Sequence, residues 1–235
     1  MQRFGRVAMA SASLGSTAGP RPGEALGEVV RAEGSARHPW PAAPDLLKSA
    51  DGARNLADFI HYLCVLHGRY PGVVDHASLR TTDAEARAWL ANAAYAFAGE
   101  RAFLAKLAAA AGPVPSTPGA ADTDAVVQAQ RHAIDMLAQS ERAGCAVGAA
   151  MAVVLDWPVL RRPLAAAADR FGVETPDFAA PDPVITAAVA DRFAAASAGT
   201  TRALLFGARQ ILAQHYGLLD LLEVRAQART AAEAA

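Results

Sequence analysis

The chain has 235 residues, of which 53% are hydrophobic, 19% charged and 6% aromatic, and its formal net charge is -1. Sixty residues are alanine, the strongest helix former, and too few are β-branched or aromatic for a sandwich or a barrel. The composition therefore predicts an all-α fold. The balanced charge provides no field for binding nucleic acid or an anionic membrane, so neither is an expected partner.

The chain is expected to be cytoplasmic. Its longest uncharged run, residues 143–155, is shorter than the roughly 20 residues that span a bilayer, so no membrane span is predicted. Arg3 and Arg6 precede only a short apolar stretch, which is less than the apolar region of a signal peptide. Cys64 and Cys145 lie in apolar helical patterns, which favours reduced, buried thiols.

The first 52 residues differ in composition from the rest of the chain. They are rich in Gly, Pro, Ala and Ser, and their one apolar patch is formed by Leu26, Val29 and Val30. Such a segment is predicted to bury too little apolar surface to offset the entropy lost on ordering. We therefore expect a disordered tail over residues 1–52 and a helical bundle domain over residues 53–230.

Apolar residues spaced three and four apart predict the helices of this domain. The expected helices cover residues 53–70, 82–111, 122–155, 158–171 and 183–229, the last with a break near 197–199. The segment Asp156-Trp157-Pro158 is expected to end the third helix and open the short fourth one. An antiparallel four-helix bundle with two short extra helices is the predicted architecture. Gly144 and Gly148, one helical turn apart, predict a close approach to a neighbouring helix.

The sequence contains none of the common catalytic motifs. It has no P-loop, no GxGxxG or GxSxG pattern, no HExxH and no Cys/His zinc spacing. An enzymatic function is therefore not favoured. The first hypothesis is a non-catalytic interaction or scaffold module, whose ligand is another protein or a second copy of the chain in a homo-oligomer.

Each long helix places one ionisable residue on its otherwise apolar stripe. These residues are His67, Glu100, Glu141 and His215. Burying such groups without a partner costs several kcal/mol, so each is expected to be paired. In one interpretation the two glutamates bridge to arginines of a neighbouring helix, such as Arg202 or Arg209, and fix the helix register. In the other interpretation the inward groups hold a ligand.

A Glu-Arg-Ala triplet begins at both Glu100 and Glu141, at the same position of the apolar stripe. With these inward carboxylates, residues 53–229 resemble the ferritin-like four-helix bundles, in which Glu and His side chains hold two metal ions. The resemblance implies an iron or manganese site with Glu100, Glu141 and His215 as ligands. The family's Glu-x-x-His motif is degenerate, because neither glutamate is followed by histidine three residues later. The second hypothesis is therefore a degenerate ferritin-like protein that binds a metal or a small ligand. Apart from this resemblance, no cofactor is expected.

Overall fold

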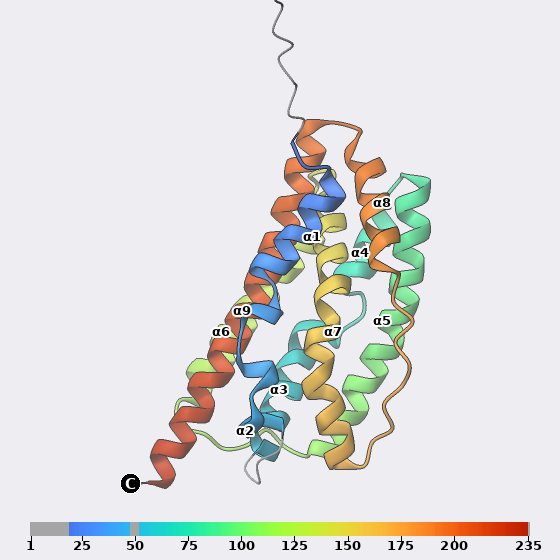
Figure 1. Cartoon of the computed structure of the whole chain (residues 1–235). Helices are drawn as coiled ribbons and strands as arrows, with labels where there is room; N and C mark the ends of the chain where they lie inside the picture. Colours follow the sequence, from blue (N-terminus) through green and yellow to red (C-terminus); the bar gives the residue numbers. More distant parts are fainter. Residues whose placement is uncertain (1–18, 48–51, 235) are drawn as a thin grey trace, which may run out of the picture.

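The computed structural model of the protein describes residues 19–47 and 52–234, and every regular element within them is helical (Figure 1). The longer helices are α1 (Pro22–Glu33), α3 (Gly52–His67), α5 (Ala84–Ala111), α6 (Ala120–Ala138), α7 (Cys145–Phe171), α8 (Pro183–Ala194) and α9 (Ala198–Glu233). The shorter elements are α2 (Pro44–Leu47), α4 (Val73–Arg80) and the 3-10 turns η1 (Ser35–Arg37) and η2 (Trp40–Ala42). The prediction of an all-α fold is confirmed.

Helix α7 lies at the centre of the structure. It contacts α1, α3, α4, α5, α6, α8 and α9, and Figure 1 shows it between α5 on one side and α9 on the other. Its residues from Cys145 to Leu155 are apolar, and those from Cys145 to Val154 are all buried. The helices are thus arranged around α7, and the expected antiparallel four-helix bundle with two short extra helices is not confirmed.

Helices α7 and α9 touch through their backbones. A Cβ atom on Gly148 would overlap the carbonyl oxygen of Leu204, and one on Gly207 would overlap that of Cys145. Gly144 also lies against α9, next to the carbonyl oxygen of Thr200. The predicted close approach at Gly144 and Gly148 is therefore confirmed, and α9 supplies a glycine of its own to the same contact.

The single helix predicted over residues 122–155 is wrong. Helix α6 ends at Ala138, and α7 begins at Cys145 after a loop. Gly144 ends this loop with φ = 102°, a left-handed conformation that interrupts a right-handed helix. The three- and four-residue spacing of the predicted stripe continues across the loop from Leu137 through Glu141 to Gly144, so this spacing alone does not reveal the interruption.

The predicted helix end at Pro158 is also wrong, because α7 continues through Pro158 and Pro163 to Phe171. Each proline removes a backbone donor and strains the preceding turn. Trp157 and Leu160 are nonetheless fully buried in this stretch, and we attribute the continuity of the helix to their packing. The predicted stop at Gly172 is confirmed, since this residue caps α7 with φ = 68°.

The N-terminal region is more ordered than its composition predicts. Residues 1–18 and 48–51 lie outside the described part of the chain, but residues 19–47 form helices packed on α7, α8 and α9. Leu26 and Trp40 are 0% and 5% exposed. The backbone N–H of Gly23 donates to Asp191 of α8 at 2.7 Å. The expectation of a disordered tail is therefore wrong for this segment, because long-range contacts supply the burial that its own composition lacks.

The last helical region follows the predicted pattern. Asp182 caps the first helix of this region, α8, and the break after Ala194 precedes Ser197, which caps α9. Within residues 19–47 and 52–234, no helix combines the length and apolarity that crossing a membrane requires.

Candidate functional site

A chain of hydrogen-bonded polar side chains runs through the interior. His67, at the end of α3, and His215 of α9 face each other with their Nε2 atoms 2.9 Å apart. The Nδ1 atom of His215 lies 2.8 Å from a carboxylate oxygen of Asp156 in α7. Asp156 also accepts hydrogen bonds from the backbone N–H and the hydroxyl of Ser35, at 2.8 and 2.6 Å. The chain therefore joins α3, α9, α7 and η1.

The environment sets the charges of these groups. Burial lowers the pKa of His67 well below its usual range, and the nearby His215 and Arg131 lower it further, so His67 is neutral. Burial by itself would raise the pKa of Asp156, but the hydrogen bonds from His215 and Ser35 outweigh it and the pKa is lowered. Asp156 is therefore an ionised acceptor, which requires a proton on the Nδ1 atom of His215.

Glu100 of α5 is the centre of a second hydrogen-bonded cluster, which lies next to the chain of His67, His215 and Asp156. Its carboxylate accepts a hydrogen bond from the indole N–H of Trp157 at 2.7 Å and one from Arg161 at 3.0 Å. The ring of Trp157 meets that of His67 edge-on, with their centres 5.4 Å apart. Trp157 thus lies between Glu100 and the histidine pair. The predicted bridge from Glu100 to an arginine exists, but the partner is Arg161 rather than Arg202 or Arg209.

The structure separates the three residues that the sequence suggested as metal ligands. Glu100 and His215 are buried in this polar interior, whereas Glu141 is exposed in the loop between α6 and α7. Glu141 lies outside the interior because the loop ends the helix on which the sequence pattern placed it. Among the residues that the structure describes, no three His, Cys, Asp or Glu side chains are grouped to hold a metal ion. The donors present do not fit the two-metal site that the ferritin-like resemblance implies.

Sequence reasoning missed Asp156 and Ser35, the two groups that anchor His215. The sequence pattern places Asp156 at a helix break and Ser35 in the tail. A signal for Asp156 does exist, because it continues the small-residue face of α7 at four-residue spacing from Gly148 and Ala152. The contact between Ser35 and Asp156 joins residues 121 positions apart and has no local signature.

A separate ion-pair cluster fixes the far end of α9. Asp58 of α3 is fully buried and accepts hydrogen bonds from Arg225, at 2.9 and 3.1 Å, and from Arg229. Arg225 also lies over the ring of Tyr62, whose pKa is raised to about 12 by burial and by its hydrogen bond to Asp124. These groups hold one another in place, so we assign the cluster a structural role.

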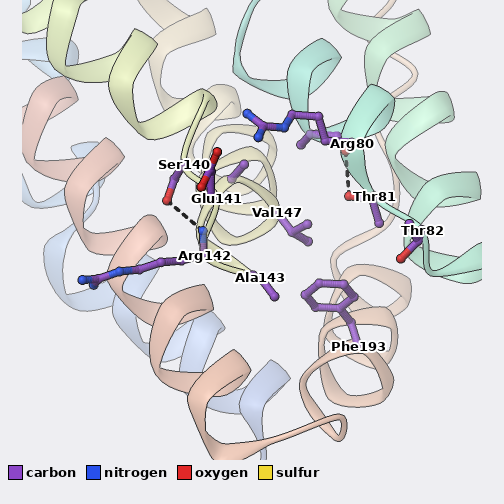
Figure 2. A pocket seen from close by; sticks show the side chains of 12 residues that line it. Arg80, Thr81, Thr82, Ser140, Glu141, Arg142, Ala143, Val147 and Phe193 are labelled. Atoms are coloured by element: carbon purple, nitrogen blue, oxygen red, sulfur yellow. Dashed lines mark hydrogen bonds between the residues drawn. The ribbon is translucent and has the colours of Figure 1, made fainter.

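The surface is hollowed around the loop of residues 139–144. One hollow of about 380 Å³ lies between this loop, the end of α4 and α8. Figure 2 shows Ala143, Val147 and Phe193 grouped in it, with Arg80 and Thr82 at its edge and Arg142 pointing away from Phe193. Its centre is therefore apolar and its rim polar.

Two further hollows adjoin the first. One of about 610 Å³ is formed by Arg142, Ala143 and the start of α9, up to Phe206. The other, of about 290 Å³, lies between α6 and α9 and is reached past Met136 and Phe206. We call the three hollows together the loop surface. Two of its large apolar side chains are exposed, Met136 at 62% and Phe206 at 46%.

The described residues form an all-helical protein with hydrogen-bonded polar side chains in its interior and a hollowed surface at one loop. The chain belongs to a family of unknown function, DUF6975, whose model matches residues 30–230. The matched region includes part of α1 and both turns that follow it, in agreement with their packing on the other helices. No curated protein and no solved structure matches the chain significantly.

Proposed function

We propose that the protein is a non-catalytic module that binds a partner protein through the loop surface. The observation that carries this proposal is the concentration of three adjoining hollows, with exposed apolar side chains, around residues 139–144. Exposed apolar side chains that are grouped within a polar rim favour an interaction site. An apolar centre with a polar rim is also the usual anatomy of a protein interface.

The hydrogen bonds of the polar residues in the interior also support this proposal. The carboxylates of Glu100 and Asp156 each accept two or more hydrogen bonds from neighbouring side chains or backbone, and His67 is paired with His215. None of these four residues lines the hollows of the loop surface. Their hydrogen bonds are used to hold helices together, and this favours a structural role over a chemical one.

The arginines of the loop surface favour contact with a partner protein rather than with solvent alone. Among the residues that the structure describes, the side chains of Arg142 and Arg202 form no ion pair or hydrogen bond. Arg80 donates only to the backbone carbonyl of Gln139. Most arginines in the interior, in contrast, contact carboxylates, as Arg161 contacts Glu100. Unpaired guanidinium groups beside apolar hollows are suited to carboxylates supplied by another molecule.

Site-specific photocrosslinking tests this proposal. A photoreactive phenylalanine analogue replaces Phe206 in the full chain, expressed in its own cells, and the adducts are identified by mass spectrometry. The matched control carries the same analogue at Tyr95, which is 83% exposed on α5. We expect a discrete adduct from position 206 that position 95 does not give. Equal adducts from both positions, or none from position 206, would contradict the proposal. An adduct of twice the chain mass would identify a second copy as the partner.

A further inference from the structure

The hollow between α6 and α9 has the form of a groove for a helix. Figure 1 shows the two helices side by side, and they are in direct contact. The walls are formed by Ala133, Met136, Leu137 and Ser140 on one side and by Phe206, Gln210 and Gln214 on the other. The α9 positions recur every four residues, and Ala133, Met136 and Leu137 lie on one face of α6, so the groove runs along the helix axes.

The size of the groove suits an apolar helix face. From Phe206 to Gln214 it extends about 12 Å at 1.5 Å per residue, which is about two turns of a helix laid alongside. Its volume of about 290 Å³ is enough to hold several water molecules. Apolar side chains spaced i, i+3 or i+4, and i+7 on a partner helix would replace this water against Met136 and Phe206.

Charge distinguishes the two ends of the groove. None of the described residues that line it carries a carboxylate. At the end nearest the start of α9, the hollow beside Phe206 is lined by Arg142 and Arg202, whose guanidinium groups have no partner among the described residues. A helix lying in the groove would therefore meet two unpaired positive charges at one end and neutral glutamines at the other.

From this arrangement we propose that the α6/α9 groove binds an amphipathic helix of a partner protein, with acidic residues at the end that faces Arg142 and Arg202. The proposal rests on the proposed function and specifies the partner's chemistry. The apolar face of the partner supplies the affinity, while its carboxylates fix the direction in which the helix lies. A basic amphipathic helix is rejected by the same two arginines.

A selection on the purified full chain tests this inference. The probe is a displayed library of 15-residue peptides with random side chains on a helical framework. We expect the enriched peptides to carry apolar residues spaced i, i+3 or i+4, and i+7, with Asp or Glu clustered at one end. Fluorescence anisotropy then measures binding of the best peptide to the wild type and to four variants. Two replace groove walls, Phe206→Ser and Met136→Ser, and two replace arginines, Arg202→Gln and the control Arg37→Gln.

The expected effects differ between the variants. Each groove variant should weaken binding at least tenfold, as expected for loss of an apolar anchor. Arg202→Gln should weaken it about two- to fivefold at 0.1 M salt, because an exposed ion pair contributes little. Arg37→Gln lies in another hollow, beside Tyr216, and should have no effect. Circular dichroism and thermal unfolding establish that each variant is folded, and the two groove variants serve as checks on each other.

Three outcomes would overturn the inference. The first is enrichment of basic peptides or of none, and the second is binding that neither groove variant weakens. The third is a wild-type chain that sediments as a dimer and becomes monomeric with Phe206→Ser, because a second copy would then occupy the groove. If any of these is found while position 206 still crosslinks to another protein, the proposed function stands and only the helix inference fails.

Discussion

His67 and His215 face each other with their Nε2 atoms 2.9 Å apart in the interior, and this distance requires one proton between them. The Nδ1 atom of His215 already carries a proton toward Asp156. A further proton on His67 would add a buried positive charge near Arg131, while the one carboxylate in contact with the pair, Asp156, is already shared with Ser35. The pair is therefore stable only while His67 is neutral.

The first prediction concerns the pH dependence of stability. Because the pKa of His67 is lower in the folded chain than its ordinary value of 6.5, the unfolded chain binds more protons, and acid favours unfolding. The stability that depends on a neutral His67 is fully present above pH 6.5 and is lost as the pH falls below 6.5. Urea unfolding should show the free energy of unfolding decreasing by about 1.4 kcal/mol from pH 7.5 to 5.5. His67→Gln, whose amide can donate to His215, should flatten this dependence. An unchanged slope in the variant would refute the assignment.

The second prediction compares the two glutamates that the sequence pattern placed together. Glu100→Gln should lower the free energy of unfolding by about 2 kcal/mol, because it leaves the Arg161 guanidinium without its carboxylate. Glu141→Gln, in the exposed loop, should change it by less than about 0.5 kcal/mol. Chemical unfolding at pH 7.5 measures both. Equal losses would mean that Glu141 is paired in a way that the structure does not describe.

These two residues illustrate how far the sequence could predict the site. Helical spacing placed His67, Glu100 and His215 inward, because the apolar stripe of a helix is a local property of its sequence. Glu141 fitted the same spacing, but the left-handed turn at Gly144 ends the helix register before α7 begins. The three- and four-residue spacing of the stripe continues across this loop from Leu137 to Gly148, so the spacing could not reveal the turn.

The fold shows a similar limit. The stop at Gly172 and the start at Asp182 could be predicted because they depend on neighbouring residues alone. The ordering of residues 19–47 could not, because it depends on contacts with α8 and α9 more than 100 residues away. The composition of a segment indicates how much apolar surface the segment can bury by itself. It does not indicate how much of that surface is buried by contacts with the rest of the chain.

The third prediction tests the close contact between α7 and α9. Gly148→Ala places a methyl group against the backbone of Leu204 and should lower the free energy of unfolding by about 3 kcal/mol. The matched control is Gly99→Ala in the interior of α5, where the added methyl meets open space. This control should be stabilised by about 0.5–1 kcal/mol, because alanine is the better helix former. Thermal unfolding of both variants measures this difference in stability. A neutral Gly148→Ala would show that the two helices do not touch there.

The fourth prediction concerns the N-terminal helix. Leu26→Ala removes a fully buried side chain of α1 and should cost about 2–5 kcal/mol of stability. Leu79→Ala, at a position 74% exposed on α4, is the control and should cost less than about 0.5 kcal/mol. Urea midpoints of the two variants report the difference. If Leu26→Ala matched the control, residues 19–47 would be the tail that their composition suggests.

The central claim is that the loop surface binds a partner protein, and the affinity of the partner identified by crosslinking tests it most directly. Isothermal titration calorimetry would compare the Kd of that partner for the wild type and for Phe206→Ser, with Leu79→Ala as a control for an exposed apolar side chain elsewhere. We predict at least a tenfold weaker Kd for Phe206→Ser and an unchanged Kd for the control. The same Kd for all three proteins would contradict the account.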